Sequence, residues 1–195
     1  MNSEFQAIVE LMSMLVLDPH TGLLMALLAL AAWSDWSTRR IPNFLVLVAV
    51  LMGLSVNALW PATPGAGLVS ALAGAGCGLT LMLPLYLLRA MGAGDVKLMA
   101  MAGAFLGFPM ILHAVLATFM AGGVLALAYG VRKGVVRRML ANMGGVLQGA
   151  ALSVVAHERP SLAIEQAESV GRLPYGLAIA GGTIGYLVLH QLLLV

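Results

Sequence analysis

Long apolar segments separated by short polar or helix-breaking stretches make up most of this chain. They predict helices over about 19–36, 42–60, 67–89, 96–108, 109–131 and 173–195. Asp18-Pro19 is typical of a helix N-cap followed by proline at the first helical position, and Pro42 opens the second helix. Segment 96–108 is the weakest of the predicted membrane spans, because a full span needs roughly 20 residues.

The composition places these helices in a membrane. Of the 195 residues, 61% are hydrophobic and 9% charged, whereas soluble domains carry roughly 25% charged residues. A soluble core could not bury this much apolar surface, which excludes a soluble domain and predicts an all-α polytopic membrane protein with about six transmembrane helices. We expect one domain over 1–195, with an interfacial segment at 1–18 and a cytoplasmic loop at 132–171.

Cysteine content and the amino-terminal residues exclude some kinds of site and of targeting signal. The single cysteine, Cys77, excludes an internal disulfide and a CxxC zinc site, and the four histidines show no ligand spacing. The sequence therefore predicts no metal and no cofactor. The start Met1-Asn-Ser-Glu4 has no positive region and no small-residue cleavage site follows, so we expect no cleavable signal peptide.

The charged residues separate cleanly onto the two sides of six spans. All ten Lys and Arg residues fall on one side, and Glu4, Glu10 and Asp18 fall on the other. The positive-inside rule makes the first side cytoplasmic. Both termini are then expected outside, and a bilayer with anionic headgroups is an expected partner of the basic loop.

Two carboxylates, Asp35 and Asp95, fall at the cytoplasmic ends of apolar segments. A carboxylate at membrane depth is costly and usually functional. Two close carboxylates cannot both ionise easily, so one could take a proton from water while the other, protonated, hydrogen-bonds a scissile carbonyl. The alternative for Asp35 is a solvated interface residue beside Arg39. Asp95 could instead be an ordinary partner of Lys97 or a helix N-cap.

Residues around the two aspartates have expected supporting roles. Gly92 and Gly94 would let a substrate backbone approach and let a loop adopt positive φ. Lys97 could neutralise the pair, orient a carboxylate or bind a substrate carboxylate. Pro42 would fix the start of the second helix, and Asn43 could hydrogen-bond the loop that carries Asp35.

Three motifs carry a resemblance to a known family. Residues 35–43, Asp-Trp-Ser-Thr-Arg-Arg-Ile-Pro-Asn, resemble the first catalytic motif of type IV prepilin peptidases, and residues 92–97, Gly-Ala-Gly-Asp-Val-Lys, resemble their GxGD motif. Residues 173–181, Leu-Pro-Tyr-Gly-Leu-Ala-Ile-Ala-Gly, look like the closing motif of the small branch that serves tight-adherence (Flp-type) pili. The resemblance spans about residues 20–190.

The resemblance implies that Asp35 and Asp95 are the catalytic pair. It implies that the loop of the second motif is shaped by Gly92, Gly94 and Lys97. The residues of the first motif with an expected site-shaping or substrate-binding role are Arg39, Pro42 and Asn43. It implies cleavage of the basic leader from a prepilin or pseudopilin at the cytoplasmic face of the bacterial inner membrane. Larger relatives that also N-methylate the product carry an extra amino-terminal region with paired cysteines, which this sequence lacks, so we expect no methyltransferase activity.

Other readings remain open at this point. The chain could be a small transporter that uses the two aspartates as proton or ion sites, or a non-catalytic membrane subunit of a pilus assembly. Three loop carboxylates could attract a basic leader, or simply form a solvated face: Glu158, Glu165 and Glu168. No nucleic-acid partner is expected, and the oligomeric state is left open.

Overall fold

Six α-helices form the described part of the chain, which comprises residues 18–60, 67–87, 91–134, 136–137 and 175–194 of a computed structural model. They are α2 (Pro19–Thr38), α3 (Asn43–Leu59), α4 (Leu68–Leu87), α5 (Ala93–Leu106), α6 (Met110–Lys133) and α9 (Tyr175–Leu194). Each coincides with one predicted segment, and the described residues contain no strand. The all-α prediction is therefore confirmed. Apart from their edges, segment 1–18 and loop 132–171, with its three glutamates, lie outside the described residues.

Local sequence signals explain where the helices begin and end. The Asp18 carboxylate accepts a hydrogen bond from the backbone N–H of Thr21 at 3.2 Å, and Pro19 is the first residue of α2, as predicted. Pro42 directly precedes α3. After α5, Gly107 adopts a positive φ of 70°, a conformation that glycine tolerates and that ends the helix.

Length and composition identify three of the six helices as able to cross a membrane: α4, α6 and residues Tyr175–Leu193 of α9. Helix α3 is apolar but has 17 residues, and α5 has only 14. A span needs roughly 20 residues when it runs straight across the hydrocarbon layer. The chain is thus an all-α membrane protein, and six complete spans remain a prediction.

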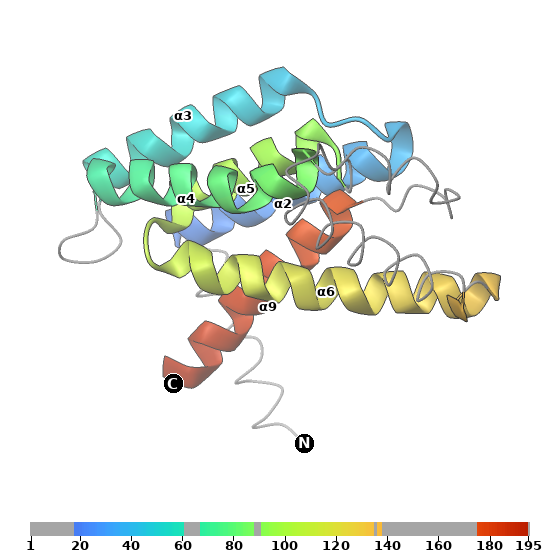
Figure 1. The fold of residues 1–195 in the computed structure, drawn as a ribbon. Coiled ribbons are helices and arrows are strands. Elements are labelled where there is room, and N and C mark those ends of the chain that lie inside the picture. Colours follow the sequence, from blue (N-terminus) through green and yellow to red (C-terminus); the bar gives the residue numbers. More distant parts are fainter. Residues whose placement is uncertain (1–17, 61–66, 88–90, 135, 138–174, 195) are drawn as a thin grey trace, which may run out of the picture.

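Helix α5 is the centre of the bundle (Figure 1). It packs most extensively on α4 and also contacts α2, α3, α6 and α9, while α6 packs mainly on α9. Most of its side chains are buried, including Leu98, Met99 and Met101, none of which is exposed. The helix therefore holds Asp95, near its amino end, inside the protein.

Glycines allow α4 and α5 to pack with their backbones in contact. A Cβ atom added to Gly74 would collide with the backbone oxygen of Gly103, and one added to Gly78 would lie 2.7 Å from the oxygen of Met99. Close backbone approach through small residues is the usual way in which helices associate in lipid, where apolar side chains gain little from leaving the bilayer. These glycines set the position of α5 in the bundle.

We expect Gly74→Ala to lower the apparent thermal midpoint of the purified protein in detergent. The added methyl group meets backbone rather than a flexible side chain, so the two helices must separate, which costs on the order of 1–3 kcal/mol. The matched control is Gly76→Ala on the same helix, because nothing lies within 4 Å of its Cβ position. Equal midpoints for the two variants would contradict this account of α4–α5 packing.

The buried side-chain amide of Asn57 binds the carboxyl end of α5. The side-chain nitrogen of Asn57, on α3, lies 3.0 Å from the backbone oxygens of both Ala104 and Phe105, and 3.1 Å from that of Gly53. Carbonyls in the last turn of a helix lack partners within that helix. Asn57 supplies these partners where water is excluded, and thereby fixes α3 against α5.

Candidate active site

Asp35 lies in the last turn of α2, with only 8% of its surface exposed. Its Oδ2 accepts a hydrogen bond of 2.9 Å from the backbone N–H of Gly176. Gly176 is the second residue of α9, so this N–H is one of those that have no partner within their own helix. The amino end of a helix also carries partial positive charge, which stabilises a carboxylate there.

Asp95 occupies the first turn of α5 and is 9% exposed. Its Oδ2 accepts a hydrogen bond of 3.0 Å from the backbone N–H of Gly92, the N-cap residue. Asp95 is therefore not the N-cap itself but the residue three positions later, which bonds back to the start of the helix. Each aspartate thus lies at the amino end of a helix, Asp35 at that of α9 and Asp95 at that of α5.

The two carboxylates influence each other electrostatically. Asp95 lies at the end of α5, outside the three helices that can span a membrane. Burial raises the pKa of Asp95 from 3.8 to about 6; the Gly92 hydrogen bond opposes this rise, and the negative charge of Asp35 adds to it. A charge effect of this kind means that the two carboxylates, which come from separate sequence motifs, lie near enough to interact electrostatically.

Lys97 and Asn43 connect the two motifs directly. The Lys97 Nζ donates a hydrogen bond of 3.0 Å to the Asn43 Oδ1, which joins α5 to the first residue of α3. In the described part of the chain, Lys97 thus bonds Asn43 and forms no ion pair with Asp95. The Asn43 side chain thus binds a residue of α5, whereas the sequence suggested that it would bind the loop that carries Asp35. The Lys97 side chain remains exposed.

The glycines of the second motif differ from the expectation of a loop with positive φ. Gly92 has φ −80°, and Gly94 lies within α5, so this expectation is wrong. The reason for glycine at position 94 is space, because an added Cβ would lie 3.3 Å from the Cβ of Ile41. Gly94 therefore allows the α2–α3 connection to pack against the start of α5.

Arg39 and Pro42 shape the turn that follows Asp35. Arg39 adopts the left-handed conformation, with φ 55°, and its backbone N–H donates to the backbone oxygen of Asp35 at 2.9 Å. The Ser34 hydroxyl donates to the backbone oxygen of Arg40 at 2.9 Å, which closes the turn. Pro42, the N-cap residue directly before α3, is in an extended conformation, with φ −62° and ψ 128°. The first motif is thus a compact helix–turn–helix connection.

Gly176 is the site residue to which the sequence assigned no role. A Cβ atom at this position would lie 2.8 Å from the Asp35 Oδ2 and 2.9 Å from the Asp35 Cβ, so only glycine fits without displacement. Gly176 lies in the segment 173–181, which resembles the closing motif of the family but does not by itself indicate a contact with Asp35. Nothing local in that segment indicates which residue of a distant helix it contacts.

Two buried carboxylates of this kind can perform acid–base chemistry on one water molecule. With its pKa raised to about 6, the Asp95 carboxyl can hold a proton in mildly acidic solution. Within the described ranges, no three His, Cys, Asp or Glu side chains come together as a candidate metal site. The hydrogen bonds from Gly176 and Gly92 fix the orientation of both carboxylates.

Comparison with known proteins gives one match. A family model described as the type IV leader peptidase family matches residues 22–127, which is more than half of the chain and includes both aspartates. No curated protein and no solved structure matches the chain at a significant level.

Proposed function

The chain belongs to the type IV leader peptidase family, and from this premise we propose that it is a membrane-embedded aspartic endopeptidase that removes the basic leader from Flp-like prepilins. Membership of the family makes it a peptidase, and its apolar helices make it a membrane protein. The aspartate pair, the Flp-type substrate and the side of the membrane belong to the proposal. The description of the family, type IV leader peptidase, agrees with a substrate that carries a leader peptide.

One observation carries the mechanism: two buried carboxylates, on α2 and α5, each accept a backbone N–H at the amino end of a helix, and one affects the protonation of the other. In the proposed reaction Asp35 takes a proton from water, and the water oxygen attacks the scissile carbonyl. Asp95 carries the shared proton and donates a hydrogen bond to the carbonyl oxygen. The leaving amine then receives a proton from the pair, which restores the starting state.

Charge distribution supports cleavage at the cytoplasmic face of the inner membrane, with both termini outside. Arg39, Arg132 and Lys133 line one cavity, so these described cations lie at the end of the bundle that holds Asp35. Asp18 begins α2 and therefore lies at the opposite end of the helix from Asp35. Positive residues gather on the cytoplasmic side of membrane proteins. A prepilin would present its basic leader there and place its apolar helix in the bilayer.

The test is a processing assay in cells that lack other leader peptidases. The chain is co-expressed with a Flp-type prepilin, and the pilin is followed by gel shift and by mass spectrometry of its new amino terminus. We expect the leader to be removed directly before the hydrophobic helix. If none of a panel of prepilins is trimmed while the protein dissipates a proton or cation gradient in vesicles, the peptidase proposal fails and a transporter replaces it.

The pH dependence of cleavage should show the raised pKa of Asp95. Because the pair works with one shared proton, kcat/KM should fall by about tenfold per pH unit once pH rises above about 6, where Asp95 ionises in the free enzyme. The measurement is kcat/KM of the enzyme in detergent between pH 4 and pH 9, with Asp18→Asn as the control. A rate that stays constant from pH 6 to pH 9 would rule out Asp95 as the proton donor.

A further inference from the structure

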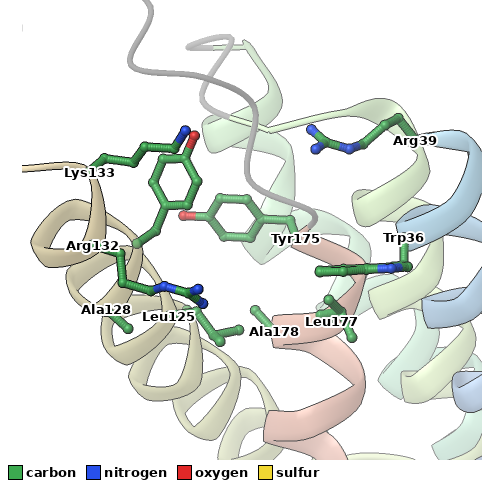
Figure 2. Close-up of a pocket in the computed structure, with 11 residues that line it drawn as sticks. Trp36, Arg39, Leu125, Ala128, Arg132, Lys133, Tyr175, Leu177 and Ala178 are labelled. Atoms are coloured by element: carbon green, nitrogen blue, oxygen red, sulfur yellow. The ribbon is translucent and has the colours of Figure 1, made fainter. Parts of the chain in front are cut away.

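A cavity of about 530 Å³ lies between α2, α6 and α9, beside the candidate active site (Figure 2). Two of its lining residues, Trp36 and Tyr175, directly adjoin Asp35 and Gly176 in the sequence. The rest of the lining comes from Arg39, at the end of α2, and from residues of α6 and α9.

One end of the cavity is strongly cationic. Arg132 and Lys133 come from the last turn of α6, and Arg39 comes from the end of α2. Figure 2 shows Arg39 and Arg132 extending toward the cavity from opposite sides, with Tyr175 between them. Among the described residues, no Asp or Glu lines this space. Arginine and lysine side chains together form a strong site for a phosphate group.

The remaining wall is apolar and follows one face of a membrane-spanning helix. Gly122, Leu125, Tyr129 and Arg132 are spaced three or four residues apart along α6, so they share one face over about 15 Å. Ala178, on α9, completes this wall. The cavity therefore offers cations at the helix end and an apolar surface that runs toward the depth of the bilayer.

We propose that this cavity binds one anionic phospholipid, with its phosphate on Arg132 and Lys133 and an acyl chain along the apolar wall of α6 and α9. Both helices can span a membrane, so the wall lies where acyl chains are present. The cavity lining includes neither Asp35 nor Asp95, so this site is separate from the proposed catalytic pair. The rival occupant is an acidic side chain of a partner protein, which would need the cations but not the apolar wall.

The experiment measures binding and needs no peptidase activity, so it can fail independently of the proposed function. The full chain is purified in a nonionic detergent and mixed with phosphatidylglycerol, phosphatidylcholine, inorganic phosphate or a short acidic peptide. Bound lipid is counted by native mass spectrometry, and the apparent thermal midpoint is recorded. We expect that, of these four compounds, only phosphatidylglycerol remains bound and raises the apparent thermal midpoint.

Two variants locate the site. Arg132→Gln should weaken phosphatidylglycerol binding by roughly fivefold or more, whereas Arg137→Gln, which removes an exposed cation outside the lining, should leave it unchanged. Ala128→Trp, at an exposed position, should fill the apolar part and also weaken binding while the lipid-free midpoint stays the same.

Several outcomes would overturn the proposal. Equal losses in the Arg132 and Arg137 variants would mean general surface attraction, and equal protection by phosphatidylcholine would mean a general bilayer effect. Protection by inorganic phosphate alone would mean an ion site without a lipid. Binding of the acidic peptide in place of phosphatidylglycerol would assign the cavity to a protein partner.

Discussion

Replacing either Asp35 or Asp95 with Asn should reduce leader cleavage by about 10³-fold or more, because an amide can neither take a proton from water nor hold the shared one. Asn has nearly the same shape and its Oδ1 can still accept the N–H of Gly176 or Gly92, so the fold should remain intact. The measurement is the initial rate of leader release in membranes that contain equal amounts of each variant.

Asp18→Asn is the matched control for both substitutions. Asp18 is an exposed N-cap residue, and Asn caps helices about as well as Asp, so this variant should cleave at the wild-type rate. Retention of more than about a tenth of the wild-type rate in either Asn variant would argue against a dyad. A scaffold protein would tolerate all three changes alike.

Gly176→Ala should be the second most damaging change, with an expected fall in kcat of about 100-fold. The new methyl carbon would lie 2.8 Å from the Oδ2 of Asp35 and 2.9 Å from its Cβ, so the carboxylate must move or α9 must tilt. A displacement of about 1 Å in a catalytic group commonly costs 10²-fold. The measurement is kcat and KM in detergent, and we expect KM to change little, because Gly176 holds Asp35 and need not contact the substrate.

Gly181→Ala provides the control on the same helix, since nothing lies within 4 Å of its Cβ position. Alanine favours helix formation over glycine, so neither variant should lower the thermal midpoint through helix propensity. A defect of equal size in the two variants would show that α9 tolerates no substitution at all. A normal kcat for Gly176→Ala would remove the positioning role of this residue.

The order and limits of the helices follow from local signals. Asp18, Pro19 and Pro42 each act within a few residues, so their effect on where α2 and α3 begin can be predicted from the sequence. The segment 96–108, the weakest of the predicted spans, corresponds to α5, which lies in the centre of the bundle with most of its residues buried. The short length of this segment indicated that it differs from the other spans, but it did not indicate that α5 lies at the centre of the bundle.

Contacts between distant segments could not be predicted in the same way. The sequence allowed Lys97 several partners, and only the packing of α5 against α3 selected Asn43. Gly94 looked like a loop residue, because a glycine pattern does not distinguish freedom of φ from lack of space beside Ile41. The Asn57 bonds and the Gly176 bond likewise depend on how helices far apart in the chain meet.

The bond between Gly176 and Asp35 links residues 141 positions apart, in the first and last of the described helices. During synthesis, at about 5–20 residues per second, α2 therefore emerges on the order of 10 s before its partner exists. Until α9 has emerged and docked, the Asp35 carboxylate lacks this donor and its orientation is unset. Under the proposed mechanism, we expect a nascent or truncated chain without α9 to be inactive and peptidase activity to begin only after α9 has docked.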